Sequence, residues 1–297
     1  MPLEYGLHRS LKGVWRRHDP ADALPLVFDS PHSGETYPDD FVHLPPRALV
    51  RQAEDAHVAR LWSHVIEAGA TLIEAEFPRA YVDPNRSRAD IDLALLADAW
   101  DEPMAPTRKT EQGMGLVWRL ARGGAPLYAH KLTAAEVHAR IAQYYAPYHA
   151  ELEAVLTGAH RMFGAVWHVD CHSMPAIGDA FADDPGRERS DFVLGDRDGT
   201  TCDRQFTAFV KNAIAALGYS VAVNDPYKGV EIVRRYGRPA ERRHSLQIEI
   251  KRTLYMDEST LVPNAGYAKL ETDLRRLAYA LADYVRGQLG RRTGLAT

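Results

Sequence analysis

The sequence predicts an α/β fold with three layers, in which a mixed, mostly parallel β-sheet lies between two layers of helices. Short apolar runs typical of buried strands alternate with longer stretches whose apolar residues recur at helical spacing. This alternation is typical of chains in which helices connect parallel strands and cover both faces of the sheet. At 297 residues and 45% hydrophobic content the chain can bury a large core, and we predict a single domain over residues 1–297.

Six runs have the composition of strands and are bounded by turn-forming or polar residues. They are Leu24–Asp29, Ala70–Glu76, Ala165–Asp170, Asp191–Gly195, Tyr219–Asn224 and Ser245–Ile250. Helical spacing of apolar residues predicts four helices, namely Pro46–Gly69, Thr133–Leu156 with a kink at Pro147, Thr201–Leu217 capped by Gly218, and Asn264–Leu289. The region Leu96–Leu127 is irregular, and we interpret it as a surface excursion in preference to a lid over a site.

Composition and charge exclude several classes of function. The net charge of −4 and the isoelectric point near 6.4 give no electrostatic case for binding nucleic acid. No stretch approaches ~18 consecutive apolar residues, and the N-terminal segment lacks the apolar core of a secretory signal. The two cysteines, Cys171 and Cys202, form no C-x-x-C pair, which suits a reducing compartment. We therefore expect a cytoplasmic protein that does not act on membranes.

The first candidate site follows the first predicted strand, where LPLVFDSPHSG spans Leu24–Gly34 and is followed by Glu35. The apolar run ends at Asp-Ser-Pro and presents His32 and Glu35 in an H-x-x-E spacing at the C-terminal end of the strand. Open α/β sheets bind their ligands at this edge. Imidazole and carboxylate are ligands that a catalytic zinc ion takes, but this short motif is also common by chance.

A second histidine follows another predicted strand. The run AVWHVDCHSMP, Ala165–Pro175, alternates as a strand does: Trp167, Val169 and Cys171 share one face, and His168, Asp170 and His172 share the other. If the two strands are neighbours, His32 and His172 can bind one metal ion, with Asp170 or Asp29 accepting the other imidazole N–H. Either histidine alone is better explained as a structural residue, whereas both together with nearby acids favour a metal site.

The run SLQIEIK, Ser245–Lys251, places an acid on a predicted sheet strand. Glu249 points away from the apolar face of this strand, and a buried carboxylate needs a partner or a chemical role. A metal-dependent hydrolase needs a carboxylate that takes a proton from water and passes it to the leaving amine. A structural salt bridge from Glu249 to Arg252 or Arg243 is an equally favoured explanation.

Two further segments supply arginines, whose guanidinium groups bind carboxylates in bidentate fashion. The run FPRAYVDPNR, Phe77–Arg86, contains Arg79, Asn85 and Arg86. The run VRRYGRPAERR, Val233–Arg243, contains Arg234, Arg235, Arg238, Arg242 and Arg243. This second run is either an anion-binding loop or a solvated basic turn, and we favour the turn for the last three arginines.

Seven motifs occur in order along the chain: SPHSG, EDAHVARL, FPRAYVDPNR, YYAPYH, VDCHSMP, VRRYGRP and QIEIKRTLYMDE. Over most of its length the chain thereby resembles the N-formylglutamate amidohydrolases (N-formylglutamate deformylases), relatives of the zinc carboxypeptidases and aspartoacylases. The resemblance implies a phosphorylase/hydrolase-like (zinc-carboxypeptidase-like) fold and one divalent metal ion per chain, zinc in the first place. It also implies a small-molecule N-acyl amino acid substrate, above all N-formyl-L-glutamate, cleaved to formate and L-glutamate as in histidine degradation.

The resemblance also implies a role for each candidate residue. It places His32 and His172 on the metal, Glu249 as the catalytic base, Arg79 at the oxyanion, and Asn85, Arg86 and Arg234 at the carboxylates of the substrate. An aromatic residue is commoner in the family at the position of Glu231, so the preferred acyl group and amino acid stay open.

The carboxylate ligand of the metal is either Glu35 or Asp55. Carboxypeptidases and aspartoacylases use the glutamate of H-x-x-E, which corresponds to Glu35. Many deformylase-like relatives have Thr or Arg there but keep an acid that corresponds to Asp55. Asp55 lies three residues before Val58, on the core-facing side of the predicted Pro46–Gly69 helix, and we favour it as the ligand.

Three alternatives differ in chemistry. A cysteine hydrolase would use Cys171 beside His172, but adjacent residues of a strand point to opposite faces. A different metal hydrolase, resembling an aspartoacylase or carboxypeptidase, would act on another N-acyl amino acid or peptide. A non-enzymatic binding protein on the same fold is disfavoured, because every candidate catalytic position keeps a chemically competent residue.

Overall fold

A mixed eight-stranded sheet forms the centre of the structure, a computed structural model that describes residues 8–180 and 182–293. Its strands are β1 (His8–Leu11), β2 (Trp15–His18), β3 (Leu26–Ser30), β4 (Thr71–Ala75), β5 (Val166–Met174), β6 (Phe192–Gly195), β7 (Val221–Val223) and β8 (Arg243–Lys251). They lie in the order β1-β2-β4-β3-β5-β8-β6-β7. The neighbours β4, β3, β5 and β8 run parallel, as do β6 and β7, whereas the pairs β1–β2, β2–β4 and β6–β8 are antiparallel.

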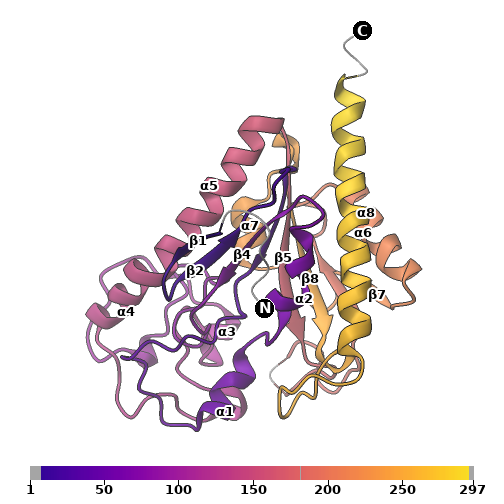
Figure 1. Cartoon of the computed structure of the whole chain (residues 1–297). Helices are drawn as coiled ribbons and strands as arrows, with labels where there is room; N and C mark the ends of the chain where they lie inside the picture. The colour runs from indigo at the N-terminus through magenta and orange to yellow at the C-terminus, as the bar shows by residue number, and fades with distance from the viewer. Residues whose placement is uncertain (1–7, 181, 294–297) are drawn as a thin grey trace.

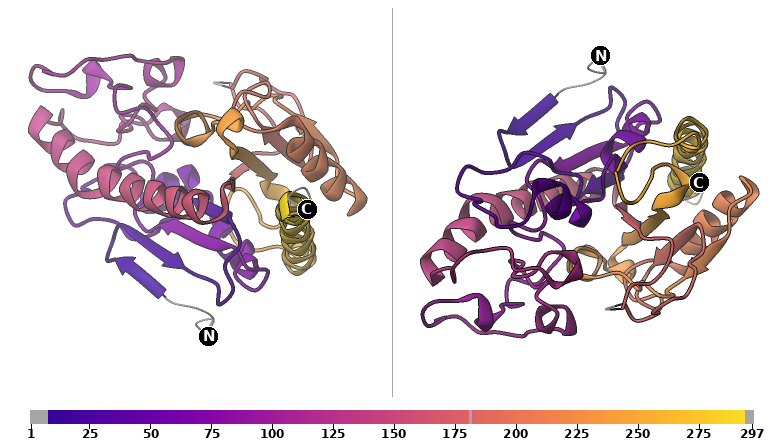
Figure 2. Two further views of the ribbon diagram at one scale, coloured as in Figure 1. Left: turned by 90° about the horizontal axis from the view of Figure 1, so that it is seen from above. Right: turned by 90° about the horizontal axis from the view of Figure 1, so that it is seen from below.

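Helices cover both faces of this sheet (Figures 1 and 2). The α-helices are α1 (Arg47–Val50), α2 (Val58–Leu61), α3 (Arg108–Glu111), α4 (Ala134–Arg140), α5 (Ala146–Phe163), α6 (Arg204–Ala216), α7 (Glu231–Tyr236) and α8 (Tyr267–Thr293). The helices α2, α6 and α8 pack on one face, and α4, α5 and α7 pack on the other. The predicted three-layer α/β/α architecture is therefore confirmed.

The alternation of side chains along the central strands creates two hydrophobic cores. In β3, Leu26 and Phe28 enter the core under α2, α6 and α8, whereas Val27 enters the core under α5. In β5, Val169 and Cys171 face the first of these cores. The opposite face of β5 carries polar side chains in a buried position. One of them, His168, is bound on both ring nitrogens, since Nε2 lies 2.8 Å from Asp29 Oδ1 and Nδ1 lies 2.8 Å from Ser245 Oγ.

The six predicted strands are present, with shifts of a few residues at their ends. The sequence gives no signal for β1 and β2, because HRSL and WRRH are polar and β1 is exposed. The helices predicted over Thr201–Leu217 and Asn264–Leu289 correspond to α6 and α8. The one predicted over Thr133–Leu156 is divided into α4 and α5 by a π-helical turn at Ile141–Tyr145, just before Pro147.

The single helix predicted over Pro46–Gly69 is wrong. Only α1, α2 and short 3₁₀ turns form there, and the chain is extended at Glu54. Backbone contacts with other segments explain the interruption: the Asp55 N–H donates to the His32 carbonyl at 2.9 Å, and Arg252 donates to the Glu54 carbonyl at 2.7 Å. The spacing of Val58, Leu61 and Val65 nevertheless identifies positions that pack in the core, since all three side chains are buried.

The irregular region Leu96–Leu127 is not a plain surface excursion, contrary to our interpretation. It contains α3 and a 3₁₀ turn, and several of its side chains form a wall of a cavity of ≈ 480 Å³. In the part of the chain that the structure describes, no helix combines the length and apolar character needed to cross a membrane. The first seven residues, where we looked for a secretory signal, lie outside the described residues.

Candidate active site

A cavity of ≈ 480 Å³ opens at one edge of the sheet. Because β3, β4, β5 and β8 are parallel, their C-terminal ends meet at this edge, and the segments that follow them line the cavity. His32 follows β3, the loop with Arg79, Asn85 and Arg86 follows β4, and His172 and Glu249 lie near the ends of β5 and β8. Parallel strand order thus brings together residues that are far apart in the sequence.

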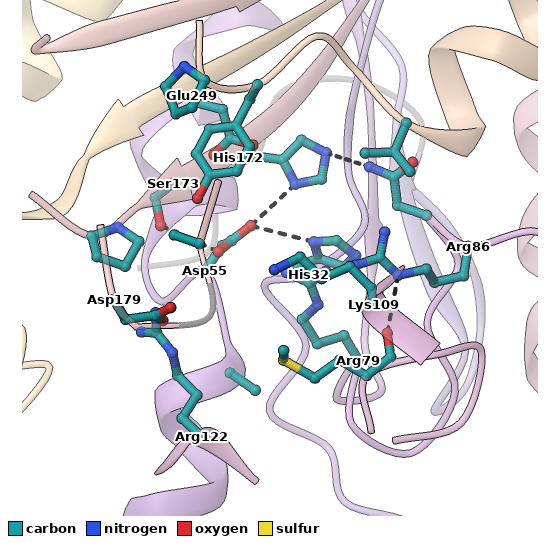
Figure 3. Close-up of a pocket in the computed structure, with 18 of the residues that line it drawn as sticks. His32, Asp55, Arg79, Arg86, Lys109, Arg122, His172, Ser173, Asp179 and Glu249 are labelled. Carbon is teal, nitrogen blue, oxygen red and sulfur yellow. Dashed lines mark hydrogen bonds and ion pairs between the residues drawn. The ribbon is translucent and has the colours of Figure 1, made fainter. Parts of the chain in front are cut away.

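Two histidines and one carboxylate converge among the residues that line the cavity (Figure 3). His172 Nδ1 lies 3.1 Å from Asp55 Oδ2, and His32 Nδ1 lies 3.4 Å from the same oxygen. The three potential ligand atoms lie within 4.8 Å of one another, and all three side chains are buried. We refer to His32, Asp55 and His172 as the His–Asp–His group.

Each histidine of the group is held by a second acid. His32 Nε2 lies 2.7 Å from Asp83 Oδ1, and His172 Nε2 lies 2.7 Å from Asp170 Oδ1. A carboxylate at Nε2 fixes the ring orientation and favours the proton on that nitrogen, which leaves the Nδ1 lone pair facing Asp55. Metal-binding histidines are usually held in this way. Asp170 therefore lies where the sequence analysis expected a partner, whereas Asp29 pairs with His168 instead.

The electrostatics of the group fit a bound cation. His32 Nδ1 is buried and has no hydrogen-bond partner among the described residues, although such an orphaned polar atom is costly. Burial would lower the pKa of His172, but Asp170 and the hydrogen bond to Asp55 raise it well above its ordinary value. Two nitrogen lone pairs and a carboxylate oxygen at this spacing attract positive charge, either a proton or a divalent metal ion.

Asp55 is fixed so that one of its oxygens remains for the histidines. Its Oδ1 accepts hydrogen bonds from Arg252 Nη2 at 3.0 Å and from Ser173 Oγ at 3.3 Å, which leaves Oδ2 directed at His32 and His172. Burial opposes ionisation, but His172, His32 and Arg252 hold the pKa of Asp55 well below its usual range. Arg252 thus pairs with Asp55, and the salt bridge to Glu249 that we considered is not formed.

Glu35, the other candidate ligand, points away from the group. Its side chain is 50% exposed and forms an ion pair with Arg51 at 3.1 Å. The close approach of the chain to the loop after β4 explains this direction. A side chain at Gly34 would collide with the carbonyl of Phe77, and Thr36, the residue after Glu35, donates its N–H to the Glu76 carbonyl at 2.8 Å. The structure therefore brings Asp55, and not Glu35, to the two histidines.

Glu249 lies beside the His–Asp–His group without belonging to it. It is the register partner of His172 on the neighbouring strand, and its Oε1 accepts a hydrogen bond from Gln247 Nε2 at 2.8 Å. Burial raises the pKa of Glu249 to about 7, His172 opposes this shift, and Asp55 adds to it. The carboxyl group therefore loses its proton as the pH rises through neutrality. A group with such a pKa can accept and donate a proton near neutral pH.

The side chains of the loop that follows β4 differ in how many hydrogen bonds they form with other protein groups. Arg79 donates from Nε and Nη2 to Asp83 Oδ2 at 3.1 and 2.8 Å, and lines the cavity. Asn85 Oδ1 accepts from the backbone N–H of Ile232 at 2.9 Å, and its Nδ2 donates to Asp170 Oδ2 at 3.5 Å beside His172 Nε2. The side-chain amide of Asn85 is thus engaged at both ends.

The guanidinium group of Arg86 forms fewer hydrogen bonds than that of Arg79. It donates from Nε to the Met114 carbonyl at 3.2 Å, and Asp90 is 4.0 Å away from the same nitrogen. Burial, opposed by Asp83 and helped by Arg79, lowers the pKa of Arg86, as expected for a cation in a positive, poorly solvated wall. Such a wall favours an anionic ligand.

The structure does not bring Arg234 into the cavity. Its side chain is 55% exposed and pairs with Glu231 Oε2 at 2.6 Å, one turn earlier in α7. Among the described residues that line the cavity, none of the five arginines of Val233–Arg243 occurs. This finding corrects the sequence-based placement of Arg234 and agrees with a basic turn. Glu231 is buried, and its carboxylate is engaged by Arg234.

The geometry gives no support to a cysteine nucleophile. Cys171 belongs to the hydrophobic core on the face of β5 opposite His172, and its thiol donates to the Val169 carbonyl at 3.6 Å. Burial raises the pKa of Cys171 well above its ordinary value, so the reactive thiolate is disfavoured.

Sequence reasoning missed the roles of three residues that organise the site, namely Asp83, Gln247 and Arg252. Asp83 lies inside the FPRAYVDPNR motif, where a buried acid beside two arginines could have indicated a histidine partner. Gln247 shares the polar face of β8 with Glu249, so strand alternation alone places it correctly. Arg252 follows β8 and reaches Asp55 across 197 residues of sequence, a pairing that no local pattern indicates.

Comparisons with known proteins show the family of the chain. The sequence model of the N-formylglutamate amidohydrolase family matches residues 24–256. The chain belongs to this family. N-formylglutamate deformylase of Pseudomonas aeruginosa strain PAO1 is 31% identical over 239 residues, covering 79% of this chain and 83% of the relative. N-formylglutamate deformylase of Pseudomonas putida is 30% identical over 248 residues, covering 80% of this chain and 83% of the relative.

Two solved structures extend the comparison. The N-formylglutamate amidohydrolase of Ralstonia eutropha JMP134 superposes with a TM-score of 0.88 at 48% identity, over 93% of this chain and 99% of the other. The gene product Atu2144 of Agrobacterium tumefaciens has a TM-score of 0.63 at 19% identity, over 91% and 96% of the two chains. The second likeness shows the fold alone. The N-formylglutamate amidohydrolase family is a family of hydrolases, and the site described above lies within the segment that matches it.

Proposed function

We propose that this amidohydrolase cleaves the formyl amide of N-formyl-L-glutamate to formate and L-glutamate, with one divalent metal ion, zinc in the first place. The observation that carries the proposal is the His–Asp–His group beside Glu249, a buried carboxyl group whose pKa lies near neutrality. The names of the two Pseudomonas relatives, both N-formylglutamate deformylases, support the substrate. Zinc is favoured by the two imidazoles and one carboxylate, although metal availability also decides which ion is bound.

The His–Asp–His group would hold the metal through His32 Nδ1, His172 Nδ1 and Asp55 Oδ2. Three protein ligands leave a coordination position open, which is typical of catalytic sites. When bound there, the metal supplies Lewis-acid activation of water and of the amide carbonyl. Asp83, Asp170 and Arg252 contribute by orienting the side chains of the group. Each of them contacts the nitrogen or oxygen atom that does not face the proposed metal position.

Proton transfer is the role of Glu249. Its carboxylate takes a proton from the attacking water as the water oxygen bonds to the formyl carbon. It then gives the proton to the nitrogen as the carbon–nitrogen bond breaks, so that formate and the free amine leave. Arg79, which lines the cavity and is held by Asp83, stabilises the negative charge that develops on the carbonyl oxygen.

Arg86 is proposed to bind the α-carboxylate of the substrate. Arg86 lines the cavity, and its Nε donates to the Met114 carbonyl and lies 4.0 Å from Asp90. Asn85 had the same expected role, but its engaged amide supports a different one, which is to hold His172 and Asp170 in place. The single catalytic domain over residues 1–297, the cytoplasmic location and the part in histidine degradation stay predictions.

The direct test is to incubate the purified protein with N-formyl-L-glutamate and measure formate and glutamate. Arg86→Ala is expected to lower kcat/KM for this substrate about 10- to 100-fold, because charge-assisted hydrogen bonds to a carboxylate are strong. N-formyl-L-isoglutamine, whose α-carboxylate is a neutral amide, should lose much less. An equal loss for both substrates would mean that Arg86 acts on the scaffold or on the oxyanion. Faster turnover of N-acetyl-L-aspartate by the wild type would favour an aspartoacylase instead.

A further inference from the structure

A substrate with two carboxylates needs a second cationic subsite in addition to Arg86. The cavity contains such a subsite. Seven lysines and arginines line the cavity against four acids, namely Arg79, Arg86, Arg108, Lys109, Arg122, Lys228 and Arg252 against Asp55, Asp179, Asp183 and Glu249. Arg79 and Arg252 are committed to Asp83 and Asp55. In Figure 3, Arg122 and Asp179 lie on one side of the His–Asp–His group and Arg86 lies on the other.

Arg122 is held in position by a closed turn. It begins the 3₁₀ turn Arg122–Gly124, which the backbone bond from Ala121 N–H to the Ala125 carbonyl closes at 2.8 Å. A bridge between Leu120 and Pro126 fixes the base of this turn. The turn presents the side chain to the cavity, where burial and the neighbouring Arg252 lower the pKa of Arg122. Arg252 is therefore near enough to act on Arg122 electrostatically, and Asp179 opposes its effect.

The guanidinium group of Arg122 already binds a carboxylate of the protein itself. Arg122 Nη2 donates to Asp179 Oδ2 at 3.1 Å, and Asp179 belongs to the loop after β5. The two side chains are 30% and 47% exposed. Ion pairs with this exposure contribute little to stability, so another carboxylate can replace Asp179 at small cost. Met114 and Trp118 line the same cavity and offer apolar surface to the methylene groups of a substrate.

We propose that Arg122 binds the side-chain carboxylate of the substrate, and that Asp179 occupies this position until the substrate displaces it. The inference rests on the proposed function and adds the residue that selects for an acidic side chain. Arg122 thereby takes the role that the sequence analysis gave to Arg234. Arg86 and Arg122, on two sides of the reacting amide, would together hold both carboxylates and fix its position at Glu249.

The test uses N-formyl-L-glutamate and N-formyl-L-glutamine, which differ only in the charge of the side chain. Arg122→Gln is expected to lower kcat/KM for N-formyl-L-glutamate about 10- to 100-fold, mainly through KM, and to leave N-formyl-L-glutamine within about threefold. Asp179→Asn is expected to act in the opposite direction and to lower KM for N-formyl-L-glutamate, because it removes the competing carboxylate.

Two matched variants control for general effects on the loops. Arg119 lies in the same segment, has nearly the same exposure of 29% and pairs with Asp92 at 2.7 Å, but it lines a neighbouring smaller cavity. Asp225 is exposed and pairs with Arg187. Arg119→Gln and Asp225→Asn should leave the ratio of kcat/KM for the two substrates unchanged.

A binding measurement separates this inference from the proposed function. Calorimetric titration with L-glutamate and with L-glutamine should show that wild type prefers L-glutamate and that Arg122→Gln loses this preference, whether or not the protein turns over. Failure of wild type to release formate would overturn the proposed function alone. The inference is overturned if Arg122→Gln weakens both ligands or both substrates equally. It is also overturned if Asp179→Asn raises KM for N-formyl-L-glutamate, since Asp179 would then be a necessary anchor of Arg122.

Discussion

Glu249→Gln is expected to lower kcat for N-formyl-L-glutamate by ~10²–10⁴-fold while the protein keeps its metal. The amide of glutamine has nearly the same shape as the carboxyl group but cannot accept the proton of the attacking water. Metal retention is expected because Glu249 lies outside the His–Asp–His group and contacts Gln247. Steady-state kinetics and metal content by mass spectrometry, measured on the same preparation, check both parts.

Glu258→Gln is the matched control for this change. Glu258 lies outside the cavity lining, where it accepts a hydrogen bond from the backbone N–H of Ala176, and its replacement should leave kcat within a few-fold of wild type. If Glu249→Gln loses the metal along with activity, Glu249 is a ligand. If the variant keeps more than a tenth of the wild-type kcat, another group transfers the proton.

Asp55→Ala and Glu35→Ala are expected to have opposite effects on metal binding. Asp55→Ala removes one of the three proposed metal ligands and leaves Arg252 without its carboxylate, so the protein should lose the metal and its measurable activity. His172→Ala should behave in the same way. Glu35→Ala removes an exposed partner of Arg51 and should keep both metal and activity, because exposed ion pairs contribute ~0–1 kcal/mol.

Unpaired Arg252 could also unfold the Asp55 variant, so a second variant is needed. Asp55→Asn preserves the volume and a hydrogen-bond acceptor for Arg252 but removes the charge that attracts the metal. Far-ultraviolet circular dichroism and thermal unfolding show whether each variant is folded, and equilibrium dialysis against zinc measures its affinity. Loss of metal from Glu35→Ala with retention in folded Asp55→Asn would reverse the assignment of the carboxylate ligand.

Much of the site could be predicted from the sequence because it follows from the period of two along β-strands. The alternation in AVWHVDCHSMP separates the core face of Cys171 from the polar face of His172, and SLQIEIK places Glu249 in the same way. Parallel neighbours then bring their C-terminal ends together, which explains why His32 and His172 meet. These inferences need only local pattern and strand order.

The remaining features depend on tertiary contacts that no local pattern contains. Asp55 reaches the histidines because its backbone binds the His32 carbonyl, which interrupts the helix that the apolar spacing predicts. Arg234 has the expected motif, but its pairing with Glu231 holds it outside the cavity. Arg122 lies in a segment without periodicity, and only the fold shows that this segment is a wall of the site. Motifs thus identified the residues of the His–Asp–His group better than they identified the arginines that line the cavity.

The measurement that tests the central claim most directly is the rate of formate release from N-formyl-L-glutamate by protein freed of metal with a chelator. The His–Asp–His group beside Glu249 predicts that the metal-free protein is inactive. Addition of zinc should restore turnover in proportion to the metal added, with saturation at about one ion per chain. Full activity of the metal-free protein, or no recovery with zinc or any other divalent metal while the protein remains folded, would contradict metal-dependent amide hydrolysis at this site.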